Sequence, residues 1–331
     1  MIEMSLFRSR CCPYTLNKKM GITSVLALPV LVVLLAGIYY VYNEVLRFMS
    51  KSVVRNKVVV ITDATSGVGC ECSRLFHKRG ARLILCGKSW DKLESLSNDL
   101  SSASDPSVTF TPKLVVLDFS DTDRTAGVVT EILECFGCVD VLICNSSMKV
   151  KAPAQSISLD LDKTVMDTNY FGPVTVAKGL LPSMMSRRSG HLLLVNSVQG
   201  KLSLPFRSAY AASKHAVQAF FDCLRSEVEE YGISVSTINH TFINTAPQEL
   251  VPSCTSDKTL WACLSRHLSH GVSPGDLAET ILSTVSRRKR EVLVAHPIPW
   301  AALYLRSLFP NLFFAVVAAG VKDSAMAEQI Q

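Results

Sequence analysis

The sequence predicts an α/β fold in which a parallel sheet of about seven strands is covered by helices on both faces. The first observation is an alternation of short β-branched runs with helix-length amphipathic segments over residues 55–295. The second is a hydrophobic content of 48% in 331 residues, which is ample for one large core. The third is a glycine-containing turn between the first strand and the first helix, typical of dinucleotide-binding sheets.

An uncharged apolar segment, residues 20–43, follows a short basic tail at residues 1–19. As a helix it is long enough to cross about 30 Å of hydrocarbon. Tyrosines at 39, 40 and 42 would lie at the interface. We expect a membrane anchor. A cleaved signal peptide is the alternative, although the apolar core is long and lacks a clear small-x-small cleavage site. Basic residues flank both ends and do not predict the orientation.

Seven runs carry the strand pattern, and helical segments separate them. The expected strands are Val58–Thr62, Leu83–Cys86, Leu114–Leu117, Val139–Ile143, His191–Val195, Ile233–Ile238 and Glu291–Val294. The expected helices run from the glycine turn to Lys78, then Trp90–Ser101, Asp121–Cys135, Leu159–Ser186 with a bend near Gly172-Pro173, Ser208–Tyr231 and Pro274–Ser286. Right-handed crossovers then give a Rossmann-like, doubly wound sheet in a single domain.

Two segments near the C-terminus depart from this pattern. Thr245–Gly271 is irregular. Residues 296–331 are apolar and aromatic, but their uncharged part is short for a span and Pro310 interrupts it. We expect this segment to lie on a membrane or to cover a substrate, with an ordinary packed helix as the alternative.

Charge and cysteine content restrict the partners. The net charge of +6 is spread through the chain, and no nucleic-acid motif accompanies it, so no nucleic-acid partner is predicted. The densest basic run, residues 287–290, reads as a solvated loop or as a contact to anionic lipid. Eleven scattered cysteines, some inside strands such as Cys86 and Cys144, favour reduced thiols and a cytosolic domain. Cys135 and Cys138 form a lone C-x-x-C, so a structural role is expected and no metal site is predicted.

A tyrosine and a lysine four residues apart, Tyr210 and Lys214, share one face of a predicted helix. An ammonium close to a phenol favours the phenolate, which suits proton transfer to or from an alcohol or ketone oxygen. Ser197 follows a strand, at the edge where open α/β sheets place their sites. The pair alone has little weight, since Tyr14 and Lys18 repeat the spacing in the tail.

The turn after the first strand reads Thr62-Asp-Ala-Thr-Ser-Gly-Val-Gly69. Backbone N–H groups of such a turn, with the dipole of the following helix, bind a pyrophosphate. The expected cofactor contacts here are Thr62, Thr65, Ser66, Gly67, Val68 and Gly69.

As an ordered set, these motifs resemble the short-chain dehydrogenase/reductase family over about residues 55–295. The matching positions are Thr62, Gly67 and Gly69 in the glycine turn, Asn145 after the fourth strand, Asn169 in a helix, Ser197, Tyr210, Lys214 and, near the sixth strand, Thr245.

The resemblance implies a role for each of these residues. Tyr210 would be the general acid/base, and Lys214 would assist it and hold the nicotinamide ribose. Ser197 would bind the substrate oxygen, and Asn169 would hold a proton-relay water. The resemblance further implies that Asn145 belongs to the cofactor site, that Thr245 binds the nicotinamide carboxamide and that Asp118 contacts adenine.

Cofactor choice depends on the end of the second strand, which reads Cys86-Gly87-Lys88. An NAD enzyme would offer a carboxylate to the ribose there. The absence of an acid and the presence of Lys88 favour NADP(H), while NAD(H) stays open.

Several positions depart from the family pattern. Asp63 replaces a glycine and brings a negative charge near the expected diphosphate, unless it turns away or caps a helix. Cys144, Ser146 and Ser147 replace most of N-N-A-G, and His240-Thr241 replaces P-G. Asn145 and Asn239 begin glycosylation sequons, but both fall at cofactor-site positions, so we expect neither to be modified.

Two functions follow as hypotheses. The first is a membrane-anchored oxidoreductase acting on a lipophilic alcohol or ketone, with retinol/retinal as the leading pair and steroids next, in the endoplasmic or sarcoplasmic reticulum membrane. The second is a catalytically weak binding or scaffold protein. A cleaved signal peptide would instead give a secreted protein, and a homodimer stays open.

Overall fold

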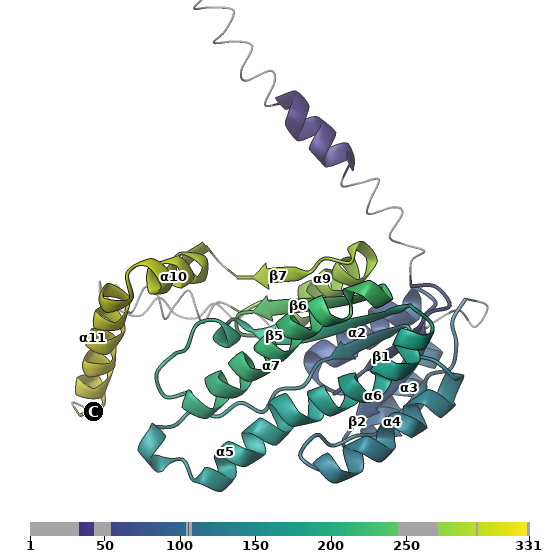
Figure 1. The fold of residues 1–331 in the computed structure, drawn as a ribbon, viewed down its shortest axis with the longest axis horizontal. Coiled ribbons are helices and arrows are strands. Elements are labelled where there is room, and N and C mark those ends of the chain that lie inside the picture. The colour runs from purple at the N-terminus through teal and green to yellow at the C-terminus, as the bar shows by residue number, and fades with distance from the viewer. Residues whose placement is uncertain are drawn as a thin grey trace, which may run out of the picture. The chain divides into compact units, whose positions relative to one another are not determined.

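The computed structural model describes residues 33–42, 54–103, 105, 108–243, 271–295 and 297–329. Within them, one parallel sheet has the strand order β3-β2-β1-β4-β5-β6-β7 (Figure 1). The order reverses between β1 and β4, where doubly wound sheets bind ligands beyond the carboxyl ends of the strands. The predicted fold class is confirmed.

The strands lie close to their predicted positions. They are β1 (Val58–Ile61), β2 (Arg82–Gly87), β3 (Lys113–Val116), β4 (Val141–Cys144), β5 (Gly190–Ser197), β6 (Ile233–His240) and β7 (Glu291–Val294). The predictions end β5 and β6 two residues too early. Both strands pair without a break until Ser197 meets His240, so both polar residues are strand termini rather than loop residues.

Helices cover both faces of the sheet (Figure 1). Because side chains alternate along a strand, Val58 and Val60 join one core and Val59 and Ile61 the other. The first core contains residues of α4 (Thr122–Phe136), α6 (Gly172–Ser186) and α7 (Ser208–Glu227). The second contains residues of α2 (Gly67–Lys78), α3 (Trp90–Ser102) and α9 (Pro274–Arg287).

The long helix predicted for residues 159–186 consists of three pieces. α5 (Leu159–Met166) leads into a π-helical turn, Asp167–Phe171, and α6 continues from it. The predicted bend near Gly172 is therefore present as a π-turn. Gly172 is required there, because a Cβ would lie 2.5 Å from the Phe119 side chain.

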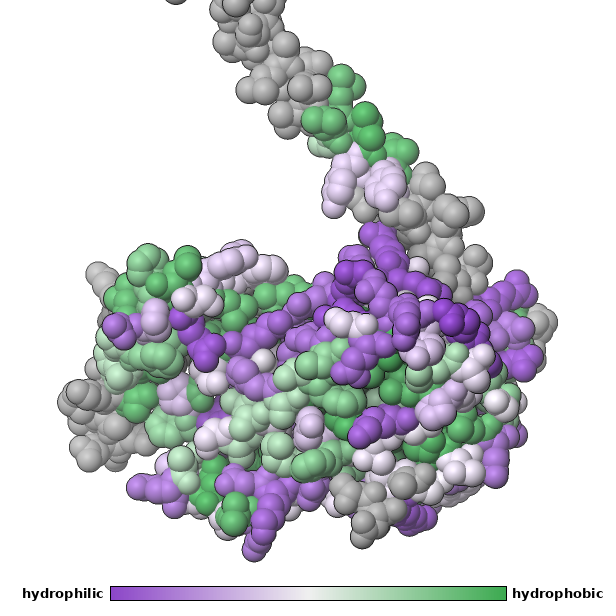
Figure 2. All heavy atoms as spheres, viewed as in Figure 1, coloured by the Kyte–Doolittle hydropathy of each residue, from purple (hydrophilic) through white to green (hydrophobic). Residues whose placement is uncertain are grey.

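The C-terminal segment forms two helices, α10 (Pro297–Leu308) and α11 (Pro310–Gln329). The break falls at Phe309, since Pro310 cannot donate a backbone hydrogen bond. A small cluster with Leu202, Ala302 and Phe313 anchors them to the loop after β5. Apolar side chains gather over α10 in Figure 2. The exposed large side chains are Trp300, Tyr304, Leu308, Phe309, Leu312 and Phe314.

A separate compact unit, residues 1–49, contributes one described helix at residues 33–42. The side chains of this helix are exposed, its three tyrosines among them. No helix within the described ranges combines the length and hydropathy needed to cross a bilayer. The rest of the predicted anchor at 20–43, the basic tail and nearly all of 245–271 lie outside those ranges.

Two of the cysteines lie inside strands of the sheet. Cys86 and Cys144 are buried and free, and burial raises the pKa of Cys144 to about 12. Cys135 and Cys138 are free and half-buried.

Candidate active site

The glycine turn after β1 is held by its own polar side chains. Ser66 caps α2 by accepting a hydrogen bond from the Gly69 N–H at 3.2 Å. The Asn145 backbone N–H donates to the Thr62 hydroxyl at 2.9 Å, and the Asn145 amide donates to the Ser66 hydroxyl at 3.0 Å. These bonds join the ends of β1 and β4 across the switch point. Thr62, Ser66 and Asn145 thus shape the turn.

Gly69 meets a packing requirement in that turn. A Cβ at this position would lie 2.2 Å from the Asp63 carbonyl oxygen. The start of α2 therefore lies directly against the backbone of the turn, and Ser66, Gly67 and Val68 line the adjoining cavity.

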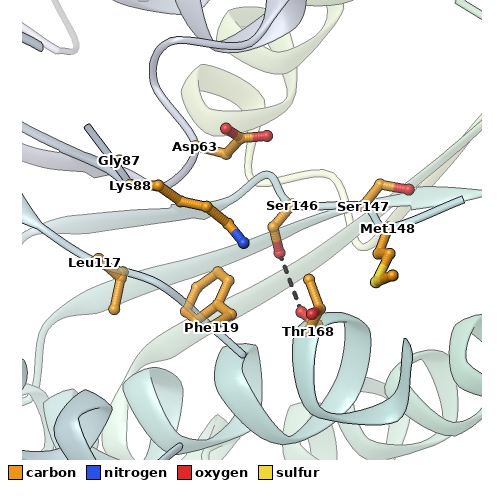
Figure 3. A pocket seen from close by; sticks show the side chains of 9 residues that line it. All are labelled: Asp63, Gly87, Lys88, Leu117, Phe119, Ser146, Ser147, Met148 and Thr168. Atoms are coloured by element: carbon orange, nitrogen blue, oxygen red, sulfur yellow. Dashed lines mark hydrogen bonds between the residues drawn. The ribbon is translucent and has the colours of Figure 1, made fainter. Parts of the chain in front are cut away.

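Asp63 stands in the left-handed region, with φ of 48°. Glycine adopts that conformation most easily, which explains why the family pattern has glycine at this position. Its side chain lines a cavity with Lys88 (Figure 3). Burial raises the pKa of Asp63, while the Lys88 charge and a hydrogen bond with Ser66 oppose that rise. Asp63 lines both cavities of the site.

The cavity beside Lys88 has a volume of about 320 Å³ and lies beyond the ends of β2, β3 and β4. Its lining residues are Asp63, Gly87, Lys88, Leu117, Phe119, Ser146, Ser147, Met148 and Thr168 (Figure 3). Lys88 Nζ lies 2.8 Å from Asp118 Oδ1 in an ion pair. Burial opposes ionisation of Asp118, but hydrogen bonds from Lys88 and Ser120 outweigh it and lower its pKa.

A second cavity of about 220 Å³ continues toward α7 and shares Asp63, Ser146 and Ser147 with the first. Its lining includes Ser66, Gly67, Val68, Asn145, Lys149, Ser197, Tyr210, Lys214 and His240. The two cavities thus extend from the end of β2 to the end of β6. Their combined course, with the close-packed glycine turn lining the second cavity, fits a dinucleotide.

Tyr210 and Lys214 lie on one face of α7 and are almost completely buried, at 3% and 2% exposure. Lys214 Nζ is 5.9 Å from the centre of the Tyr210 ring and donates to the Ser146 carbonyl at 3.1 Å. Burial lowers the pKa of Lys214 to about 7, and the charge of Lys149 adds to that effect. Both groups face the second cavity, as the spacing predicted.

Asn169 lies in the π-turn, where burial and hydrogen bonds fix its amide. Its Oδ1 accepts from the Met148 N–H at 2.7 Å, and its Nδ2 donates to the Met148 carbonyl at 2.9 Å. Nδ2 also donates to the Ser213 hydroxyl at 3.0 Å. Asn169 therefore holds the loop after β4 against α7, one turn from Tyr210. Its role toward a water molecule stays a prediction.

Ser197 ends β5 and lines the same cavity as Tyr210. It is 6% exposed, and its hydroxyl accepts a hydrogen bond from the Gln199 N–H at 3.1 Å. The structure thus brings Ser197, Tyr210 and Lys214 together. Thr245 lies outside the described residues.

Several residues of the site have no role in the sequence prediction. The Ser147 hydroxyl donates to the Tyr210 hydroxyl at 3.4 Å. His240 lies beside Ser197 in register, and burial lowers its pKa to about 4, so it is neutral near pH 7. Lys149 and Arg207 line a recess with Ser197 and Tyr210. Ser147 and His240 stood out as departures from the family pattern, whereas nothing in the sequence marked Lys149 or Arg207.

The two sequon asparagines belong to the interior. Asn145 is 8% exposed and Asn239 is 0% exposed. Neither side chain can carry a glycan in this fold.

Comparisons with known proteins agree with the family resemblance drawn from the motifs. Residues 57–253 match the family model for short chain dehydrogenases. Dehydrogenase/reductase SDR family member 7C-A of Danio rerio is 64% identical over 324 residues, which cover 94% of this chain and 100% of that protein. Member 7C of Homo sapiens is 54% identical over 306 residues, covering 92% and 97%.

Solved structures share the fold. L-sorbose reductase from Gluconobacter frateurii, complexed with NADPH and L-sorbose, superposes with a TM-score of 0.63 at 23% identity, covering 74% of this chain and 97% of that one. A metagenomic short-chain oxidoreductase in complex with NADP gives 0.58 at 21% identity, covering 73% and 97%.

Proposed function

The chain belongs to the short-chain dehydrogenase/reductase family, as its motifs predicted, and we propose that it interconverts an alcohol and its carbonyl compound with NAD(P)(H). The observation that carries this proposal is the meeting of Tyr210, Lys214 and Ser197 in the second of two adjoining cavities whose combined course fits a dinucleotide. Bound NAD(P)(H) supplies the hydride that is exchanged with the substrate carbon.

In the reducing direction, the carbonyl oxygen gains negative charge as the carbon gains hydride. The Tyr210 hydroxyl gives its proton to that oxygen, and the Ser197 hydroxyl donates a hydrogen bond to it. Lys214, held by the Ser146 carbonyl, places a positive charge beside the phenolate that remains. Oxidation runs through the same groups in reverse, with Tyr210 as the base.

Each part of the proposed cofactor would be held by a different group of residues. The turn at Ser66, Gly67 and Val68 would hold the pyrophosphate, because these residues line the cavity at the start of α2. Lys214 would hold the nicotinamide ribose and Asp118 the adenine. Lys88 favours NADP(H), although its ion pair with Asp118 means that a phosphate must compete for the ammonium.

The substrate proposed is lipophilic, with retinol/retinal first and a steroid second. Support comes from the apolar segment at residues 20–43, proposed as a membrane anchor, and from the exposed aromatic residues of α10 and α11. Residues 55–295 would form the catalytic domain on the cytosolic side of a reticulum membrane, and residues 296–331 would lie at the bilayer or over the substrate.

A binding or scaffold protein with little turnover is the second candidate. It is favoured by Asp63, which lines both cavities, including the one where a diphosphate would lie. Under this hypothesis the fold persists and the cofactor binds poorly or not at all.

Cofactor binding separates the two candidates. Full-length protein in detergent should be stabilised by about 2.7 kcal/mol at a cofactor concentration 100 times the dissociation constant. Thermal unfolding with NADPH and with NADH measures this and also decides between the two cofactors. If neither shifts the unfolding temperature, the oxidoreductase proposal fails and the scaffold candidate gains.

Replacing the proposed acid tests the chemistry. Tyr210→Phe should lower retinal reduction by at least about 10²-fold, because it removes the proton donor. Cofactor binding should persist, as measured by the same thermal shift. Tyr231→Phe, an equal change in the turn just before β6, serves as the control. Turnover that survives in Tyr210→Phe contradicts the assigned role.

A further inference from the structure

The recess beside Tyr210 has an unusual lining. It is formed by Lys149, Ser197, Val198, Gln199, Leu204, Arg207, Tyr210, His240, Thr241 and Phe242. Two of these side chains are cationic, and none is a carboxylate. Its volume is about 10 Å³, close to the room that one water-sized group needs.

Arg207 precedes α7, and its guanidinium carbon lies 4.8 Å from the centre of the Phe242 ring. A guanidinium stacked in this way is held in place with its N–H donors directed around the ring. Within the described part of the chain, the Arg207 side chain has no hydrogen bond and no ion pair. Burial lowers the pKa of Arg207, which indicates a charge that water solvates poorly.

Lys149 lines the same recess and is partly exposed to solvent. Partial burial of its ammonium lowers the pKa of Lys149, and the charge of Arg207 lowers it further, so the two cations are close enough to repel. Lys149 likewise has no ion pair or side-chain hydrogen bond to a described residue. Two unpaired cations beside one another are stabilised when an anion lies between them.

Gln199 supplies a third polar group. It is 3% exposed, and its Oε1 is buried without a hydrogen-bond partner among the described residues. Because amide O and N positions are interchangeable by rotation, the group can present its NH₂ to a ligand oxygen. A buried amide oxygen without a hydrogen-bond partner is uncommon in folded proteins, and a ligand group in the recess would satisfy this amide.

We propose that Arg207, Lys149 and Gln199 bind an oxyanionic group, such as a carboxylate, of the substrate whose alcohol or carbonyl oxygen meets Tyr210. This inference rests on the proposed function and narrows its substrate class to amphipathic compounds. The recess has room for one oxygen atom of that group, and the rest of the substrate would lie in the second cavity, which Lys149, Ser197 and Tyr210 also line. Neutral retinol lacks such a group and would leave the cations unpaired.

The test compares 4-oxopentanoate with its methyl ester, which carries the same ketone without the charge. Both dissolve in water, so detergent micelles around the full-length protein do not compete for them. NADPH consumption should give at least a tenfold higher kcat/KM for the acid, chiefly through KM. Arg207→Gln should lower the acid value about tenfold more than it lowers the ester value.

Lys151→Gln is the matched control. Lys151 lies two residues from Lys149 on the same loop and does not line the recess. The variant should keep the preference for the acid. Equal use of acid and ester by the unmodified protein would overturn the inference and leave the proposed function intact. Equal losses in Arg207→Gln and Lys151→Gln would also overturn it.

A binding measurement covers the case in which neither compound is reduced. Pentanoate should then raise the unfolding temperature of the full-length protein, methyl pentanoate should not, and Arg207→Gln should abolish the difference. That result upholds the oxyanion site while the oxidoreductase proposal fails. No shift with pentanoate, or a shift that persists in Arg207→Gln, removes the site.

Discussion

At the scale of single residues, Asp63 and Lys214 are the side chains expected to affect the proposed cofactor site most. Asp63 adopts a backbone conformation that glycine tolerates best, and it places a carboxylate in the cavity that Lys88 also lines. Lys214 is buried as a cation beside the proposed acid and has a strongly lowered pKa. Each residue lowers the stability of the fold and also lies at the proposed site. Substitutions there can therefore be tested separately for their effects on stability and on cofactor binding.

Asp63→Gly should raise the unfolding free energy by about 1 kcal/mol, because it relieves the left-handed backbone. It should also tighten NADPH binding about tenfold, because a negative charge leaves the cavity. Denaturant unfolding and fluorescence titration measure the two effects. Asp63→Asn separates them, since it removes only the charge and should tighten binding with little change in stability. Weaker binding in both variants would show that the carboxylate helps to hold the cofactor.

Lys214→Met should stabilise the cofactor-free protein more at pH 7 than at pH 10. Folding lowers the pKa of Lys214 from its ordinary 10.5 to about 7. Between these values the unfolded chain binds a proton that the folded chain lacks, so stability falls as the pH drops and levels off below about pH 7. The difference should be on the order of 3 kcal/mol, measured by denaturant unfolding.

Lys163→Met provides the comparison for that series. Its side chain is 65% exposed, so the change should have no comparable pH dependence. A flat difference between Lys214→Met and the unmodified protein across this range would mean that Lys214 stays fully hydrated in the fold.

At the scale of elements, the site depends on how closely two pieces of backbone approach. The start of α2 lies against the turn after β1, and the π-turn before α6 brings Asn169 to the loop after β4. Ser197 and His240 end adjacent strands in register, so β5 and β6 deliver both to one edge. The packing of the elements and the register of the strands therefore determine where these side chains lie, and the spacing along the sequence does not.

Gly69→Ala should destabilise the fold by about 3 kcal/mol or more and weaken cofactor binding, because its Cβ would lie 2.2 Å from the Asp63 carbonyl. Gly127→Ala is the matched change within α4, where a Cβ would meet nothing within 4 Å. It should stabilise by up to about 1 kcal/mol through helix propensity. Thermal unfolding of both variants tests this, and equal effects would contradict the packing argument.

For the whole molecule, the proposed membrane contact depends on the C-terminal helices α10 and α11. The exposed aromatic residues of α10 and α11 lie beyond the end of β7, in the part of the chain that follows the sheet. Exposed apolar patches of this kind mark interaction surfaces. They belong to the compact unit of residues 50–331 and can be tested without the proposed anchor.

A protein of residues 50–331 should float with lipid vesicles through α10 and α11. Replacing Phe309 and Phe314, which are 60% and 55% exposed, by Asp should release it. Leu159→Asp, at a residue 67% exposed on α5, should not. If vesicle binding is absent but KM for retinal rises in the Phe variants, the segment covers the substrate. If neither changes, it is an ordinary terminal helix pair.

The sequence by itself determined the succession of strands and helices along the chain, the parallel sheet and the edge of the sheet that carries the site. These follow from local periodicity and from turn chemistry at residues such as Gly67 and Gly69, which act over a few neighbours. The spacing of Tyr210 and Lys214 also needs only a helix. The family resemblance, likewise drawn from sequence motifs, added Ser197 and Asn169.

Only the tertiary structure decided which groups meet across the sheet. The Ser147 contact with Tyr210, the Lys88–Asp118 ion pair and the unpaired Arg207 beside Lys149 join segments up to 63 residues apart. Such contacts depend on the spatial order and register of the strands within the sheet, which sequence periodicity does not encode. The lowered pKa of Lys214 is likewise a property of burial and of the Lys149 charge, which exist only once the cavity has formed.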